Sequence, residues 1–409
     1  MNNAQDRHSV ASGATVENNE STVTAWKFKF GPGEEIEGYK AVSSSTIYEA
    51  QQGFGFERGS IVYEKQRIHD NESSREANRT PGNGEPVNLA SQLRSSFCIP
   101  TKAAFVMDVP DGTYQVMMIA GDELAETRTR VKAGEGRLMV PTIHTLPGQC
   151  AEIRFSVVVR GGKLRLSFSG SAPRINALEV TLANQTMTVF LAGDSTVTDQ
   201  PESGYPYCGW GQLLPAQFKH DVAVDNHAQS GRSSRSFINE GRLDAIQKKI
   251  KAEDFLFIQF GHNDEKPDPS RGTKPFTTYK EHLKKYIDVA REAGARPVLV
   301  TPVHRRYFAD DGTLTDTHGD YIVAVRELAQ EEEVPLIDLA ERSRLLFEQT
   351  GIEGTKEDFM WVLPGEFMNF PAGVEDNTHF QERGAHRLAE QVAEAIRELR
   401  LQPLQMFLR

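Results

Sequence analysis

Cysteine is scarce in this sequence. Three cysteines occur in 409 residues, Cys98, Cys150 and Cys208, and no two have the Cys-x-x-Cys spacing. An odd number of cysteines without that spacing argues against a disulfide framework and against a cysteine-ligated zinc site. Inert thiols in a reducing compartment fit the pattern better. We therefore expect the fold to depend on hydrophobic cores, which a chain of this length is long enough to form.

Excess positive charge and long apolar runs are also missing. The formal net charge is -11, which argues against sequence-independent nucleic-acid binding because that requires a basic face. No segment reaches the run of about 18 apolar residues that a membrane helix needs. Residues 1–23 contain no apolar stretch of the kind found in secretory signals. The sequence as given thus predicts a cytoplasmic protein without membrane or nucleic-acid partners, and a secreted protein if a signal precedes this numbering.

Several catalytic motifs are absent as well. The chain has no Gly-x-Ser-x-Gly, no Gly-x-x-x-x-Gly-Lys-Ser/Thr and no His-Glu-x-x-His segment. These absences exclude the usual nucleophile turn of one large serine hydrolase class, a nucleotide-binding P-loop and a common zinc protease site.

Hydrophobic patterning divides the chain near residue 184. Residues 1–23 are polar and predicted to be disordered. Residues 24–183 hold short β-type runs between turn residues, without an amphipathic helix, which predicts an all-β sandwich of the jelly-roll kind. Within it, Pro110-Asp111-Gly112 separates two such runs and predicts a hairpin. The oligomeric state stays open.

From residue 184 to 409 strands and helices alternate. Apolar runs predict strands over 186–192, 254–260, 296–301 and 334–339, and helical spacing predicts helices over 279–293, 321–332 and 381–399. Continuous apolar strands between helices indicate a parallel sheet covered on both faces. We therefore predict a three-layer α/β/α domain that follows the sandwich.

Four short segments follow or precede these predicted elements and carry polar side chains. They are Gly193-Asp194-Ser195-Thr196, Gly231-Arg232-Ser233, Gly261-His262-Asn263-Asp264 and Asp376-Asn377-Thr378-His379. In open α/β sheets, ligands bind outside the carboxyl ends of the strands. A serine, uncharged donors and an Asp-x-x-His pair are the components of acyl transfer by a serine nucleophile.

Each segment also has a plain structural interpretation. Ser195, placed at the start of a helix, is either a nucleophile with a free backbone N–H or a helix cap. Gly231 brings a backbone N–H close to a ligand or is an ordinary turn glycine. Asn263 donates to an oxyanion or forms an Asx turn. Asp376 and His379, in a loop before the last helix, form a catalytic or a structural pair, and His262, without an obvious carboxylate partner, is expected to be structural.

In combination the four segments resemble the SGNH (GDSL-type) hydrolases, over about residues 186–399. Thr196 stands where that family often has leucine. This variant is similar to the rhamnogalacturonan acetylesterase branch. Three further segments share that similarity: Asn377-Thr378-His379-Phe380, Thr301-Pro302-Val303 and Arg305-Arg306. The β-rich region resembles the galactose-binding-like sandwich that precedes such domains in some bacterial members.

The resemblance implies a mechanism and a substrate. Ser195 would attack an acetyl ester, His379 would take its proton, and Asp376 would orient His379. Ser195, Gly231 and Asn263 would form the oxyanion hole, with no metal or organic cofactor. The substrate would be an acetylated pectic oligosaccharide or polysaccharide of the rhamnogalacturonan type.

Substrate-binding side chains are a separate prediction. Candidates for stacking on sugar rings and for meeting a uronate carboxylate are Tyr205, Tyr207, Trp210, Trp361, Arg305 and Arg306. Two other functions stay open: a lipase or thioesterase of the same fold, which the polar residues Asp199, Gln200 and Glu202 disfavour, and a non-catalytic carbohydrate-binding protein with a degenerate hydrolase domain.

Overall fold

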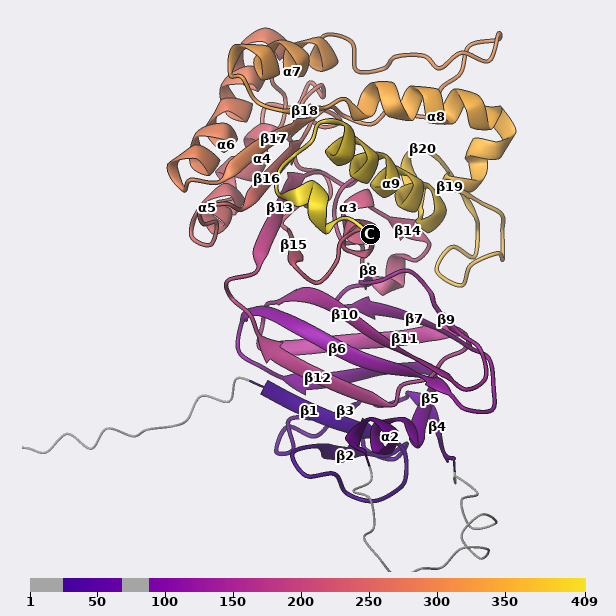
Figure 1. Ribbon diagram of the computed structural model, residues 1–409. Coiled ribbons are helices and arrows are strands. Elements are labelled where there is room, and N and C mark those ends of the chain that lie inside the picture. Colours follow the sequence, from indigo (N-terminus) through magenta and orange to yellow (C-terminus); the bar gives the residue numbers. More distant parts are fainter. Residues whose placement is uncertain (1–24, 68–87) are drawn as a thin grey trace, which may run out of the picture.

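The structure is a computed structural model that describes residues 25–67 and 88–409. The predicted disordered segment 1–23 lies outside the described residues. The chain first forms a β-sandwich and then an α/β unit that lies beside it (Figure 1). The predicted fold class, a sandwich followed by a three-layer α/β/α unit with a parallel sheet, is thus confirmed.

Two sheets make up the sandwich. One has the order β10-β6-β12-β1-β2 and the other the order β3-β5-β11-β7-β8, with β4 paired to β5 and β9 to β7. The strands are β1 (Ala25–Phe30), β2 (Lys40–Val42), β3 (Phe54–Phe56), β4 (Ile61–Gln66), β5 (Ser96–Asp108), β6 (Gly112–Asp122), β7 (Thr127–Ala133), β8 (Arg137–Leu138), β9 (Ile143–Thr145), β10 (Gln149–Val159), β11 (Lys163–Ala172) and β12 (Ala177–Leu182).

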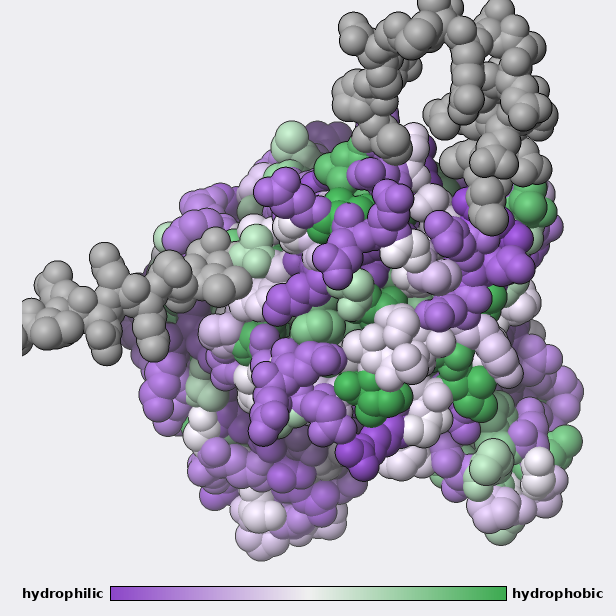
Figure 2. All heavy atoms as spheres, turned by 90° about the horizontal axis from the view of Figure 1, so that it is seen from below, coloured by the Kyte–Doolittle hydropathy of each residue, from purple (hydrophilic) through white to green (hydrophobic). Residues whose placement is uncertain are grey.

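The sandwich core forms because alternate residues of these strands are apolar. In β7, for example, buried and more exposed residues alternate along the strand. The aromatic rings of Phe28, Phe30, Phe56 and Phe105 pack between the sheets, mostly edge to face. The outer face seen in Figure 2 is mainly polar, with small separate apolar areas. One short helix, α2 (Leu89–Arg94), lies in this region, where the sequence predicted none.

The predicted hairpin at Pro110-Asp111-Gly112 is wrong. The turn connects β5 to β6, but β5 pairs with β3, β4 and β11, whereas β6 pairs with β10 and β12. The turn therefore carries the chain from one sheet of the sandwich to the other. Turn residues favour a reversal of the chain, but they do not decide whether the second strand returns to the same sheet.

A five-stranded parallel sheet forms the centre of the α/β unit, with the order β15-β13-β16-β17-β18. Its strands are β13 (Met187–Gly193), β15 (Val222–Asn226), β16 (Phe255–Gln259), β17 (Arg296–Val300) and β18 (Leu336–Ile337). They are buried on both faces, as continuous apolar runs predict. The predicted boundary at residue 183 stays a prediction; β12 ends at Leu182 and β13 begins at Met187.

Helices cover both faces of this sheet. One apolar cluster packs α4 (Ser234–Asn239), α5 (Arg242–Gln247), α6 (Lys280–Glu292) and α7 (Asp320–Glu331) against the sheet. The other cluster holds α3 (Trp210–Leu213), α8 (Leu339–Gly354) and α9 (Glu382–Glu398). A small antiparallel sheet, β14-β20-β19, joins β14 (Tyr207–Cys208), β19 (Phe359–Val362) and β20 (Val374–Gln381). In the described part of the chain, no helix is long and apolar enough to cross a membrane.

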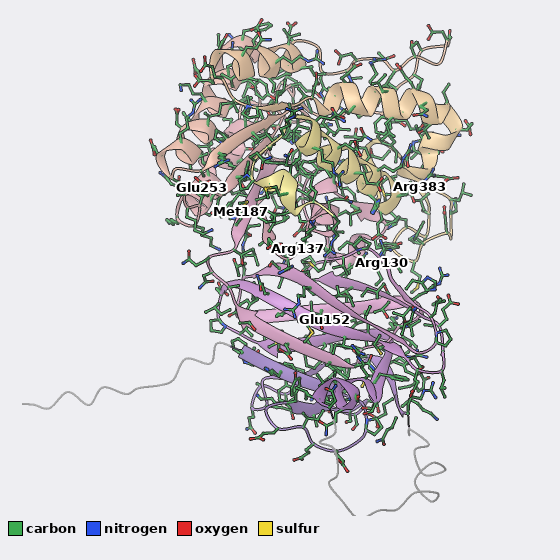
Figure 3. All side chains as sticks on the ribbon, in the orientation of Figure 1. Arg130, Arg137, Glu152, Met187, Glu253 and Arg383 are labelled. Atoms are coloured by element: carbon green, nitrogen blue, oxygen red, sulfur yellow. The ribbon has the colours of Figure 1, made fainter. Side chains whose placement is uncertain are left out.

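Ion pairs join the sandwich to the α/β unit, and the charges are arranged in the same way in each of them. The sandwich supplies the cations and the α/β unit supplies the carboxylates in every such pair of the described residues. The pairs are Arg130 and Lys132 with Glu382, Arg137 with Asp199, Arg160 with Asp225, and Arg165 with Glu202. Figure 3 shows Arg130 and Arg137 at the junction of the two parts.

Candidate active site

Three of the four sequence segments meet at the carboxyl edge of the parallel sheet. Ser195 follows β13, Gly231 follows β15 and Asn263 follows β16. These three strands are neighbours in the sheet, so the loops that follow them lie side by side. The fourth segment comes from β20, whose last residue, Gln381, leads directly into α9. The predicted loop around Asp376 and His379 is therefore a strand.

A single tight turn shapes the Ser195 loop. The carboxylate of Asp194 accepts hydrogen bonds from the backbone N–H and the hydroxyl of Thr196, at 2.9 and 2.8 Å. Thr196 in turn accepts a bond from Gln259 of β16 at 2.7 Å. No helix begins at Ser195, contrary to the prediction. The N–H groups of Val197 and Thr198 donate to the Asp194 carbonyl, and these two bonds form a turn that does not continue as a helix. The loop is thus held by side chains, and a helix dipole does not act on Ser195.

Ser195, His379 and Asp376 form a hydrogen-bonded chain. The Ser195 Oγ lies 2.9 Å from His379 Nε2, and His379 Nδ1 lies 2.7 Å from Asp376 Oδ2. The other carboxylate oxygen of Asp376 accepts the backbone N–H groups of Thr378 and His379. Burial raises the pKa of Asp376, but the bond to His379 and these N–H groups outweigh it, so the pKa lies below its ordinary value. The arrangement allows Asp376 to fix the tautomer in which Nε2 accepts the serine proton.

Two backbone N–H groups of these loops are candidate oxyanion donors. Among the described residues, the N–H groups of Ser195 and Gly231 have no hydrogen-bond acceptor, which is unusual for backbone groups in a mostly buried site. Gly231 has a φ of 81°, a conformation that favours glycine, and a Cβ built there would meet open space. Two unpaired N–H groups beside a serine can hold the oxyanion of a tetrahedral intermediate.

The side-chain amide of Asn263 is oriented by its neighbours. Its Oδ1 accepts a hydrogen bond from Lys266 Nζ at 3.0 Å, and its Nδ2 donates to the Arg232 carbonyl at 3.1 Å. These two bonds fix which end of the amide carries the nitrogen and leave its second N–H free. Lys266 was not a candidate in the sequence, since nothing in its spacing distinguishes it from other surface lysines.

Two buried titratable side chains, His262 and Asp264, contact residues of these loops. His262 Nδ1 is 3.3 Å from Asp194 Oδ2, so the carboxylate partner that the sequence did not reveal is the residue before Ser195. Burial lowers the pKa of His262 to about 4, so the ring is neutral near pH 7. Asp264, whose pKa is raised to about 7 by burial, accepts hydrogen bonds from Ser234 and Thr273. It thereby ties the Gly231 loop to the Asn263 loop.

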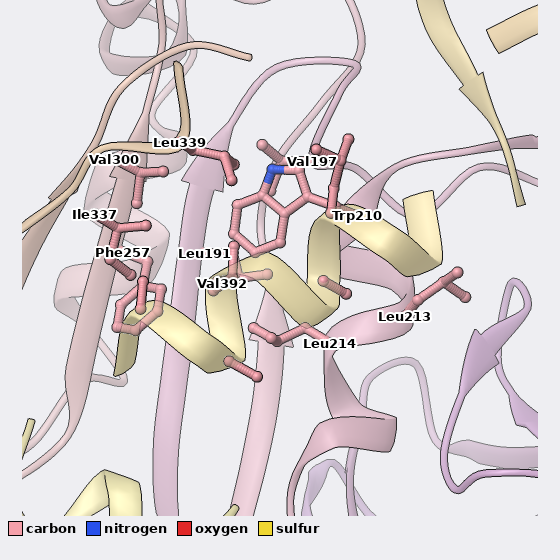
Figure 4. Packing of buried hydrophobic residues seen from close by; sticks show 14 of the residues in the cluster. Leu191, Val197, Trp210, Leu213, Leu214, Phe257, Val300, Ile337, Leu339 and Val392 are labelled. Carbon is pink, nitrogen blue, oxygen red and sulfur yellow. The ribbon is translucent and has the colours of Figure 1, made fainter. Parts of the chain in front are cut away.

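Trp210 does not lie on the substrate side, so its predicted stacking role is wrong. Its side chain is fully buried and its Nε1 donates to Gln259 at 2.9 Å. Figure 4 shows the indole among Leu191, Val197 and Leu339 in the core. The spacing of aromatic residues in a polar loop does not show which of them turns inward.

Arg305 and Arg306 are committed to internal partners, so their predicted contact with a uronate is not supported. Arg305 pairs with Glu265 and donates to Thr317. Arg306 is buried, stacks over Trp361 with its guanidinium carbon 4.7 Å from the ring centre, and donates to Thr355.

Arg306 and Trp361 both donate to the side chain of Asn377, between Asp376 and Thr378. They therefore support the strand that carries the histidine, rather than presenting free groups to a sugar.

Tyr205 and Tyr207 lie at the junction with the sandwich. They line a hollow of about 610 Å³ together with Arg130, Lys132 and Glu382. The ring of Tyr207 packs edge-on against His379 with centroids 4.9 Å apart, and Tyr205 is 42% exposed. Of the predicted sugar-stacking residues, Tyr205 is the most exposed. Within the described residues, no three His, Cys, Asp or Glu side chains are arranged to hold a metal ion.

Two family models match the chain. The GDSL-like Lipase/Acylhydrolase family matches residues 191–387, which contain all four segments. The family described as beta-agarase/YXIM esterase-like, galactose-binding domain-like matches residues 26–180. The two matches correspond to the α/β unit and to the sandwich.

Curated proteins of Bacillus subtilis are similar to the chain. Rhamnogalacturonan acetylesterase RhgT is 50% identical over 213 residues, which are 52% of this chain and 90% of RhgT. The uncharacterized esterase YxiM is 30% identical over 341 residues, 81% of this chain and 83% of YxiM. A crystal structure of the YxiM protein covers 92% of this chain and 99% of its own, with 26% identity and a TM-score of 0.49.

Proposed function

Since the chain belongs to the GDSL-like lipase/acylhydrolase family, we propose that it is a serine esterase that removes acetyl groups from rhamnogalacturonan-type pectic chains. The hydrogen-bonded chain of Ser195, His379 and Asp376 supports the reaction type. The 50% identity to a rhamnogalacturonan acetylesterase over 90% of its length supports the substrate.

The mechanism follows from these positions. Ser195 Oγ attacks the acetyl carbonyl while His379 Nε2 accepts its proton, and the Asp376 carboxylate stabilises the imidazolium that forms. The N–H groups of Ser195 and Gly231 and the free N–H of Asn263 hold the oxyanion. The imidazolium then gives its proton to the sugar oxygen, which leaves. Water, deprotonated by His379, attacks the acetyl-enzyme and releases acetate.

Acetate release tests the proposal. The substrates are acetylated rhamnogalacturonan oligosaccharides, acetylated xylan and a long-chain ester, each with wild type, Ser195→Ala and Ser45→Ala. Ser45 is an exposed serine of the sandwich and serves as the matched control. We expect release from the pectic substrate by wild type and Ser45→Ala, and a loss of at least about 10⁴-fold in Ser195→Ala.

Other outcomes separate the parts of the proposal. Release from xylan but not from the pectic substrate would keep the serine mechanism and discard the substrate. Preference for the long-chain ester would favour a lipase. Glycan binding without release of any acid, by a folded protein, would favour a non-catalytic binding function.

A further inference from the structure

A basic hollow lies directly beside the Gly231 loop. It has a volume of about 470 Å³ and its lining includes Gly231, Arg232, Arg235, Ser236, Ser270 and Arg271. Gly231 thus belongs both to the wall of this hollow and to the group of proposed oxyanion donors. A ligand in the hollow would therefore contact the loop that carries one of the proposed oxyanion donors. No step of the mechanism uses its arginines.

The guanidinium groups of the hollow are only partly neutralised. Arg232 uses its Nε on Glu240, at 2.9 Å from Oε2, and Arg271 uses its Nε on Asp268 at 2.7 Å. Glu240 also forms an ion pair with Arg242. Arg235, which is half-buried, makes no side-chain hydrogen bond or ion pair with any residue that the structure describes. The lining of the hollow therefore holds three guanidinium groups and one carboxylate, that of Glu240, and Arg235 is the guanidinium that stays unpaired among the described residues.

The chemistry of this surface points to an anionic sugar. A guanidinium binds a carboxylate through two parallel N–H donors, with charge assistance. The side-chain amide of Asn239, which lines the same hollow, suits the hydroxyls of a sugar ring. Arg305 and Arg306, the arginines that the sequence suggested for this task, already have internal partners.

We propose that this hollow is a carboxylate-binding subsite in which Arg235, aided by Arg232 and Arg271, holds a uronate residue of the acetylated chain. The subsite deepens the proposed function and rests on it for the identity of the chain. The subsite would bind the charged uronate residue of the chain and so position the neighbouring ester for reaction. It would therefore favour acidic over neutral acetylated glycans. A free phosphate or sulfate offers similar chemistry but no sugar ring.

The test compares two substrates that differ only in charge. An acetylated rhamnogalacturonan oligosaccharide and its carboxyl-reduced form are assayed with wild type, Arg235→Gln and Arg128→Gln. Arg128 is an exposed, ion-paired arginine of the sandwich and serves as the control. For wild type and Arg128→Gln we expect the reduced form to have a KM roughly fivefold higher. For Arg235→Gln the two forms should have equal KM values. The same preference in Arg235→Gln as in wild type would overturn the subsite.

Binding measurements keep the subsite testable apart from catalysis. Unacetylated oligosaccharide, its reduced form and inorganic sulfate are titrated into Ser195→Ala and into Ser195→Ala/Arg235→Gln by calorimetry. We expect Arg235-dependent binding of the acidic oligosaccharide alone. Binding of sulfate as tight as that of the oligosaccharide would overturn the uronate assignment in favour of a simple anion site. If wild type releases no acetate from pectic substrates yet Arg235-dependent binding is found, the proposed function fails while the subsite stands.

Discussion

The sandwich and the α/β unit both bury large apolar cores, but they contribute differently to the site. Every residue of the proposed machinery follows or belongs to a strand of the α/β unit. The sandwich contributes cations instead, and their carboxylate partners lie close to the active-site segments: Asp199 follows Ser195, Asp225 precedes Gly231 and Glu382 follows His379. The comparison suggests that the α/β unit performs the chemistry and the sandwich holds three of its loops in place. Variants on the two sides should therefore affect different quantities.

The largest expected effect is on turnover and comes from the α/β unit alone. Asn263→Ala should lower kcat on acetyl esters by about 10² to 10³, because one oxyanion donor is lost. Asn263→Asp keeps the shape but brings a negative charge towards the oxyanion, so it should lose at least as much. Steady-state kinetics together with urea unfolding measure both effects. Near-normal turnover of Asn263→Ala would remove this residue from the oxyanion hole.

The next effect is on stability and concerns the tie between the two parts. Glu382→Gln removes the shared partner of Arg130 and Lys132, and all three side chains are largely shielded from solvent. Breaking a buried pair leaves uncompensated charge, so we expect the free energy of unfolding to fall by about 3 kcal/mol. Glu49→Gln, which breaks an exposed pair with Arg58, should change it by less than about 1 kcal/mol. Equal losses in the two variants would contradict a holding role for Glu382.

A smaller kinetic effect is expected from Lys266, which orients the proposed oxyanion donor Asn263 without contacting the oxyanion itself. Lys266→Met removes the hydrogen bond to Asn263 Oδ1 and lets the amide turn. We expect kcat to fall roughly fivefold with little change in KM, because the lost interaction acts on the oxyanion donor. Lys284→Met, an exposed lysine of α6, is the control and should behave like wild type. An increase in KM alone would assign Lys266 to substrate binding.

The smallest effect is a change in acid sensitivity at the junction. Burial raises the pKa of Asp225, but its bond to His227 and the charges of His227 and Arg160 outweigh this and lower the pKa to about 2. A carboxyl with a lowered pKa stabilises the fold above its ordinary pKa, and this stabilisation is lost as the pH falls from about 4 towards 2. Arg160→Met should reduce that loss by about 1 kcal/mol or less.

Urea unfolding between pH 2.5 and 6 measures this acid sensitivity. Arg154→Met is the control, because Arg154 is an exposed residue of β10, the strand that ends just before Arg160, and its ion pair in the described part of the chain is with Glu152. If Arg160→Met had the pH dependence of wild type, Arg160 would contribute nothing to the ionisation of Asp225.

Local patterns in the sequence predicted much of the fold and of the candidate site. Apolar runs located β13, β16 and β17, and helical spacing located α6, α7 and α9, to within about two residues. The Asp376–His379 pair was predictable because both side chains come from one short segment. The structure brings Ser195 to hydrogen-bond distance of His379, and the catalytic roles stay predictions that Ser195→Ala and Asn263→Ala test.

Features that depend on contacts between distant segments were not predictable. The Asp194–His262 contact and the pairs between the sandwich and the α/β unit join residues far apart in the chain. Helix α8 was missed because its apolar positions are few and it contains Gly351, which breaks the regular helical geometry. Trp210 was misassigned because burial of a loop aromatic depends on what the rest of the fold places around it.

The pairing of β1 with β12 bears on how the protein is made. The first sandwich strand pairs antiparallel with the last, Ala25 opposite Thr181, so this sheet can close once β12 has left the ribosome. Domains generally fold as units during synthesis, with the N-terminal one first. Arg130, Lys132 and Arg160 would then form a preassembled basic surface while the α/β unit is still being translated. The carboxylates emerge one after another, with Glu382 last, so each would meet cations that are already in place.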